Sequence, residues 1–95
     1  MKSDGLMVIG TGPVKTKDGS SFDPAQGLLQ SGDYIEAING EPARKKEDMI
    51  EAVAKAQDSP VQLTVRRGEK QMDVTMTPLE TENGDYKLGV WIRDD

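Results

Sequence analysis

The side chains that could do chemistry here are serines, lysines and carboxylates, because the sequence contains no histidine and no cysteine. Without histidine, the usual general base and the usual partner of a nucleophilic serine are missing. Ser20 follows Lys15 and Lys17, which is compatible with a Ser–Lys dyad, but this stretch reads better as a charged turn. We therefore predict no catalytic residue and no enzyme activity for the chain alone.

Five carboxylates could in principle form an acid pair or a calcium site: Glu36, Glu41, Glu47, Asp48 and Glu51. A calcium-binding EF-hand loop alternates its ligands around a central glycine, and this pattern is absent. Thiolate zinc ligation is excluded by the lack of cysteine. These residues are typical of a solvated face, and we predict no metal site and no cofactor.

The length and charge of the chain restrict its class. Its 95 residues are enough for one small domain, and we treat 1–95 as a single domain cut from a larger protein. The net charge of −5 argues against nucleic acid as a partner, because phosphate binding needs a basic surface. No apolar run approaches the ~18 residues of a membrane span, and no signal peptide is visible.

The hydrophobic pattern predicts an α+β fold with a small, mostly antiparallel sheet. The predicted order is strand, short helix, strand, long helix and three strands, at residues 5–12, 23–27, 33–40, 46–57, 61–67, 71–77 and 87–92. The long helix carries two apolar stripes, which are wider than one core contact requires. One stripe consists of Ile50, Val53 and Ala54, and the second, adjacent stripe consists of Met49, Ala52 and Ala56.

The run "PAQGLLQSGDYIEAING", followed by a helix and "VQLTVRRG", resembles the bacterial type of PDZ domain. There a short helix leads to Gly-Leu, Gly-Asp, a strand and Asn-Gly. Here one extra residue separates Gly27-Leu28 from Gly32-Asp33. The resemblance implies a partly open antiparallel sheet or barrel of 5–6 strands with one short and one long helix, in the circularly permuted bacterial strand order.

The C-terminal stretch "YKLGVWIRDD" narrows the resemblance. A PDZ domain followed by such a stretch is similar to the sporulation stage IV B serine peptidases, in which a PDZ domain precedes the peptidase domain. That similarity implies a role in signalling proteolysis and a location outside the cytoplasm, between the forespore and mother-cell membranes. Trypsin-like heat-shock proteases, carboxy-terminal processing proteases and site-2 metalloproteases carry the next most similar PDZ domains.

The resemblance also implies a peptide-binding site. PDZ domains add an extended peptide, usually a free C-terminus, as a strand between a sheet edge and the long helix. The expected site residues are Lys87, Leu88, Gly89, Val90, Trp91 and Ile92 on one side and Met49, Ala52, Val53 and Ala56 on the other. The partner would be a protein or peptide C-terminus, bound by a monomer or weak dimer. Two alternatives stay open at this point: a structural or dimerising module, or a last strand that closes the core without a working pocket.

Overall fold

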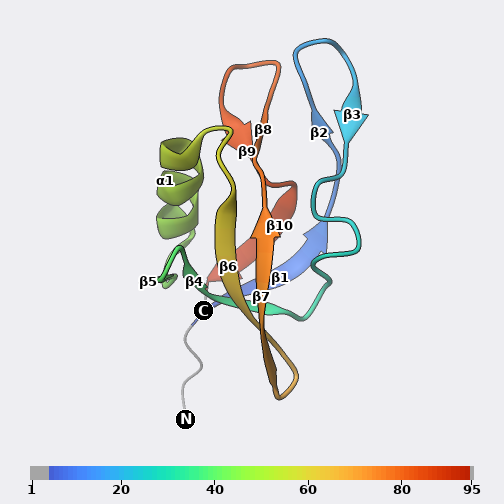
Figure 1. Ribbon diagram of the computed structural model, residues 1–95. Coiled ribbons are helices and arrows are strands. Elements are labelled where there is room, and N and C mark those ends of the chain that lie inside the picture. The colour runs from blue at the N-terminus through green and yellow to red at the C-terminus, as the bar shows by residue number, and fades with distance from the viewer. Residues whose placement is uncertain (1–4, 95) are drawn as a thin grey trace.

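The computed structural model describes residues 5–94, and its main feature is a six-stranded antiparallel sheet (Figure 1). Five strands follow the order β10-β1-β4-β6-β7, and β5 pairs with β4. Their bounds are β1 (Leu6–Thr11), β4 (Tyr34–Ile38), β5 (Glu41–Pro42), β6 (Val61–Arg67), β7 (Lys70–Met76) and β10 (Val90–Asp94). Strand β10 therefore lies at one edge of the sheet, next to β1.

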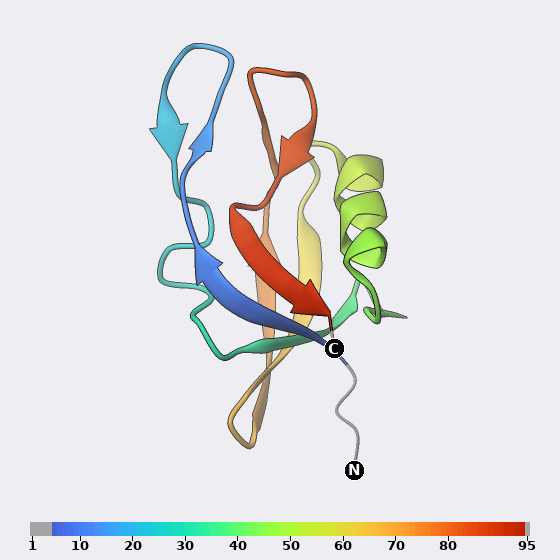
Figure 2. The ribbon, with the colours of Figure 1, turned by 180° about the vertical axis from the view of Figure 1, so that it is seen from behind.

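Two short hairpins and one helix complete the fold. The hairpins pair β2 (Val14–Lys15) with β3 (Ser21–Phe22), and β8 (Leu79–Glu80) with β9 (Tyr86–Lys87). The helix α1 (Lys46–Ala56) connects β5 to β6. Seen from behind, β10 runs between β1 and α1, so the helix stands beside the open edge of β10 (Figure 2). None of the helices in the described part of the chain is long and apolar enough to cross a membrane.

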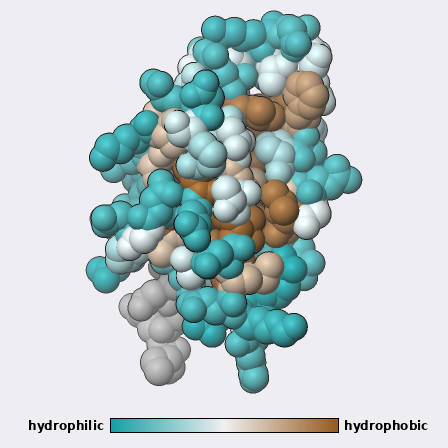
Figure 3. All heavy atoms as spheres, in the orientation of Figure 1, coloured by the Kyte–Doolittle hydropathy of each residue, from teal (hydrophilic) through white to brown (hydrophobic). Residues whose placement is uncertain are grey.

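The predicted alternation of β6 is confirmed. Val61, Leu63 and Val65 are buried, whereas Gln62 and Arg66 face solvent. The core consists of aliphatic side chains from the sheet and the inner side of α1: Leu6, Val8, Ala25, Leu29, Ile35, Ile38, Ala43, Met49, Val53, Val61, Leu63, Val65, Val74, Met76 and Leu88. On the face shown in Figure 3, hydrophobic atoms gather near the middle and hydrophilic atoms surround them.

The α+β, PDZ-like fold class is confirmed, but the short helix expected at 23–27 is replaced by consecutive turns. The amide of Gln26 donates to the Asp23 carbonyl at 3.2 Å, and the amides of Leu28 and Leu29 both donate to the Ala25 carbonyl. Gly27 has a φ of +79°, which interrupts a right-handed helix after one turn. The segment is nevertheless fixed, because Ala25 is fully buried.

Asp33 joins three parts of the sheet at the entry to β4. Its carbonyl accepts a hydrogen bond from the amide of Val8 in β1 at 2.7 Å. Its buried carboxylate accepts bonds from Nε and Nη2 of Arg67 in β6, at 2.8 and 2.9 Å, and from the amide of Gln30 at 3.0 Å. Burial alone would raise the pKa of Asp33, but the Arg67 and Gln30 hydrogen bonds outweigh it and the pKa is lowered. The carboxylate is therefore held in its charged form.

Candidate functional site

A groove of about 820 Å³ runs between α1 and the edge strand β10. The segment that joins β9 to β10 contributes Leu88 and Gly89 to its lining. Its lining includes eight of the ten predicted site residues: Met49, Val53, Lys87, Leu88, Gly89, Val90, Trp91 and Ile92. Residues separated by more than thirty positions in the chain are thus brought together along one surface.

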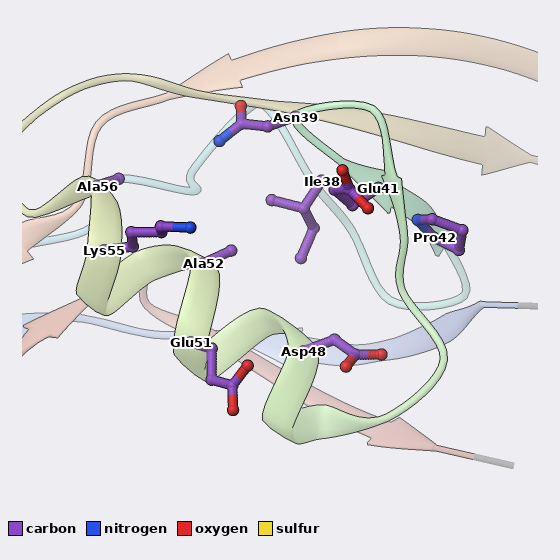
Figure 4. A pocket seen from close by; sticks show the side chains of 9 residues that line it. All are labelled: Ile38, Asn39, Glu41, Pro42, Asp48, Glu51, Ala52, Lys55 and Ala56. Carbon is purple, nitrogen blue, oxygen red and sulfur yellow. The ribbon is translucent and has the colours of Figure 1, made fainter.

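Ala52 and Ala56 do not line this groove. They line a second hollow of about 430 Å³ on another side of α1, together with Ile38 and Pro42 (Figure 4). Three carboxylates stand at this hollow, from Glu41, Asp48 and Glu51, with Lys55 beside them. Within residues 5–94 no group of three or more acidic side chains is arranged to hold a metal ion.

The helix presents a different stripe to the groove than the sequence pattern indicated. Ile50, which belongs to the stripe not predicted to form the groove wall, is 63% exposed and lines the groove with Ala54. Met49, which is predicted to form that wall, is 5% exposed and packs in the core as well as lining the groove. The two stripes are adjacent, so periodicity alone could not decide which one faces the sheet.

The segment between β9 and β10 is held by its glycine. Gly89 has a φ of +74°, and a Cβ there would lie 2.6 Å from the carbonyl oxygen of Gly12. The Gly89 carbonyl accepts a hydrogen bond from the amide of Gly12 at 2.9 Å, which ties the segment to the end of β1. Over residues 5–94, Leu88 and Gly89 donate no backbone hydrogen bond outside the helix and strands. Two successive amides beside a glycine of positive φ are the pattern of a backbone nest, which can bind an anion.

Three charged side chains line the groove, those of Lys46, Lys87 and Asp85. The side chain of Asp85 accepts a hydrogen bond from the hydroxyl of Thr81, which is the main reason that its pKa is lowered. The positive charge of Lys87 lowers the pKa of Asp85 further. Lys87 directly precedes Leu88 and Gly89, so an ammonium group stands near this turn, where it would attract an anionic group.

Several groove residues were not predicted from the sequence. Ile9, Pro13 and Gly12 come from β1 and the residues after it, while Lys46 and Ile50 come from the start of α1. The lone bulge of the β1–β10 pair, where the register shifts between Val8 and Gly10, accounts for the outward position of Ile9. A bulge of this kind has no signal in one sequence, although the closely spaced glycines Gly10 and Gly12 mark the place.

Comparison with known proteins identifies the family of the domain. A family model described as the Tricorn protease PDZ domain matches residues 8–81. The regulator of sigma-W protease RasP from Bacillus subtilis is 35% identical over 54 residues, which are 57% of this chain and 13% of that protein. A Clostridium perfringens protein named as a zinc metalloprotease is 31% identical over 68 residues, 70% of this chain and 20% of its own length. The chain thus spans a fifth or less of these relatives.

Solved structures show the same fold. The PDZ domain of an SdrC-like protein from Listeria monocytogenes has a TM-score of 0.73 and 20% identity, covering 97% of this chain and 90% of that chain. A structure from Geobacillus thermodenitrificans has a TM-score of 0.71 and 27% identity, covering 93% of this chain and 95% of that chain. Since the matched family model covers most of its residues, the chain belongs to the PDZ domain family, in the group described by the Tricorn protease PDZ domain.

Proposed function

We propose that this PDZ domain binds the C-terminus of an extended peptide as an added strand on the free edge of β10, opposite α1. The observation that carries the proposal is the groove itself, which combines an unpaired strand edge, an apolar helix wall and the Leu88–Gly89 amides at one end. The peptide backbone would continue the sheet, and its terminal carboxylate would accept hydrogen bonds from these amides. Lys87, which precedes these amides in the chain and lines the groove, supports an anionic terminus.

The expected affinity is moderate. About four ladder hydrogen bonds contribute ~0.5–1.5 kcal/mol each, and bonds to the carboxylate contribute ~1.5–3 kcal/mol. Loss of translational and rotational freedom opposes binding by several kcal/mol. A dissociation constant in the micromolar range follows, which suits a domain that tethers or regulates more than one that captures tightly.

We propose further that the domain serves a membrane-associated protease of the site-2 type. The supporting relatives are named as a sigma-W protease regulator and as zinc metalloproteases. These relatives support the site-2 alternative better than a sporulation stage IV B serine peptidase, whose resemblance rests on the stretch 86–95. The location outside the cytoplasm stays a prediction.

The binding proposal is tested by ¹⁵N-HSQC titration of the chain with a short peptide that ends in an apolar residue, and with the same peptide amidated at its C-terminus. We expect shifts at residues 88–92 and 49–54, and binding of the amidated peptide that is at least tenfold weaker, because a charge-assisted contact is lost. Shifts confined to other elements, or equal binding of both peptides, would refute the proposal.

A matched pair of surface variants locates the site. Ile50→Glu changes an exposed groove residue, whereas Phe22→Glu changes a side chain that is 53% exposed and outside the groove lining. Both should leave the fold intact because both side chains already face solvent. Only Ile50→Glu is expected to weaken peptide binding. If Phe22→Glu weakens it equally, the groove is not the site.

A further inference from the structure

The side chain of Trp91 is exposed, yet its indole packs against the backbone of two glycines. It is 57% exposed on β10, and it pairs across the strands with Gly10 of β1. The six-membered ring of its indole lies over Gly10 and Gly12. A Cβ on Gly12 would stand 2.1 Å from Cη2 of Trp91, and the three atoms nearest to it all belong to the indole. The missing side chains at these two glycines are what make room for the ring.

The edge of β10 is apolar on both of its faces. Val90 and Ile92 are partly buried and pack against the core. Trp91 points to the opposite face, where Ile9 at the β1 bulge is 49% exposed. Both Trp91 and Ile9 line the groove. An exposed indole held against backbone loses little conformational entropy when a ligand covers it, which is a common property of binding hot spots.

A peptide added to this edge must alternate its side chains in the same way. If the terminal side chain enters the side of the groove formed by Leu88 and Val53, the penultimate side chain lies on the face of Trp91. We propose that Trp91 and Ile9 form a second subsite, which selects a large apolar or aromatic residue at the penultimate position of the bound C-terminus. This proposal rests on the peptide-binding function proposed above.

The charge in the groove supports an uncharged penultimate residue over a basic one. An indole face can also attract a cation. Here Lys87 lines the same groove as Trp91, and its positive charge disfavours a basic residue in the peptide. The occupant that we propose is a peptide with two consecutive apolar residues at a free C-terminus.

The test uses two peptides that are identical except for phenylalanine or glycine at the penultimate position. Trp91 is the single tryptophan, so its fluorescence reports directly on this subsite. We expect the unaltered chain to prefer the phenylalanine peptide about fivefold, as an aromatic contact of ordinary strength implies. Because Trp91→Ala removes this fluorophore, the affinities of the variants are measured by ¹⁵N-HSQC titration. Trp91→Ala should reduce the preference for phenylalanine over glycine to less than about twofold.

Gly12→Ala is an independent variant that keeps Trp91 but places a methyl group where the indole ring lies. The ring must shift, so the preference should fall here too. Gly10→Ala is its matched control, because a Cβ there would stand 3.4 Å from Cε3 of the indole and needs only a small adjustment. Binding of both peptides with no preference, or a preference that survives Trp91→Ala, overturns the second subsite alone. Binding of neither peptide to the unaltered chain refutes the peptide-binding function itself, and with it the subsite.

Discussion

The ion pair between Asp33 and Arg67 makes the sharpest prediction about stability. The perturbation is Asp33→Ala, which deletes three hydrogen bonds to a carboxylate whose side chain is 1% exposed. The matched control is Glu36→Ala in the same part of the sheet. Glu36 also accepts two hydrogen bonds, from Arg66 at 2.8 Å and from Gln71 at 2.9 Å, but it does so at the surface.

The magnitude follows from burial. Hydrogen bonds to a charged group contribute ~1.5–3 kcal/mol each. The side chain of Arg67 is 35% exposed, so its guanidinium can bind water when Asp33 is removed. The total loss is therefore smaller than the sum over the three hydrogen bonds. We expect Asp33→Ala to lower the free energy of unfolding by about 3 kcal/mol, near the range for a broken buried pair. Glu36→Ala should lower it by less than about 1 kcal/mol, as for other surface pairs.

The pH dependence gives an independent check. The pKa of Asp33 is lowered in the folded state, because the bonds from Arg67 and Gln30 outweigh the effect of burial. Its contribution to stability is therefore complete above the ordinary aspartate pKa of about 4 and is lost as the pH falls through the lower folded value. The gap between the unaltered chain and Asp33→Ala should be widest near pH 7 and shrink toward pH 2.

The assay is urea unfolding followed by the fluorescence of Trp91, at a series of pH values. Equal losses for Asp33→Ala and Glu36→Ala would refute the reasoning from burial. A gap that stays constant from pH 7 to pH 2 would refute the assignment of the stabilising form to the charged carboxylate.

Two further predictions concern the backbone. Gly89→Ala should lower the free energy of unfolding by at least about 2 kcal/mol in urea, since positive φ costs ~1–2 kcal/mol and the new Cβ would also meet the Gly12 carbonyl. Gly84→Ala is the control, because Gly84 also has a positive φ, of +92°, but an added Cβ there would contact no other atom. It should lower the free energy of unfolding only by the cost of positive φ. Equal losses for the two variants would contradict the close contact between position 89 and the Gly12 carbonyl. Asp48→Ala should lower the thermal midpoint at pH 7, because the Asp48 carboxylate accepts the amides of Arg44 and Lys45 before α1. Those bonds lower the pKa of Asp48, so calorimetry should find the difference fading in strong acid, and a difference that persists there would count against the cap.

Local patterns were enough to predict most elements. Strand β6 was predicted as 61–67 and is Val61–Arg67, because its alternation is regular and one face is buried. Helix α1 was predicted as 46–57 and is Lys46–Ala56, since acidic residues begin it and Pro60 follows it. The dipeptide Asn39-Gly40, whose residue types favour a tight turn, forms a turn after β4 with positive φ at both residues. These features depend on neighbours in the chain, and one sequence contains that information.

Features that depend on distant residues could not be predicted in the same way. Arg67 binds the carboxylate of Asp33, 34 residues away, and nothing in the local pattern around Arg67 identifies that partner. The predicted site depends on a family resemblance, and the structure brings β10 and Gly89 to one groove with the helix. The prediction missed Ile50 and Ile9, because their exposure is set by the angle of α1 and by the β1 bulge.

The pairing of β1 with β10 has a mechanical consequence. Leu6 stands opposite Asp94, so the chain enters and leaves the domain at neighbouring points (Figure 2). A force that separates these two ends would act across the β1–β10 ladder at one end. It would break the hydrogen bonds of the ladder one after another instead of all together. The strand that this would peel off first is β10, which also forms the edge of the groove. Tension on the segments that flank such a domain would therefore pull β10 out of the sheet. A peptide bound in the groove would oppose this, because it pairs with the same strand.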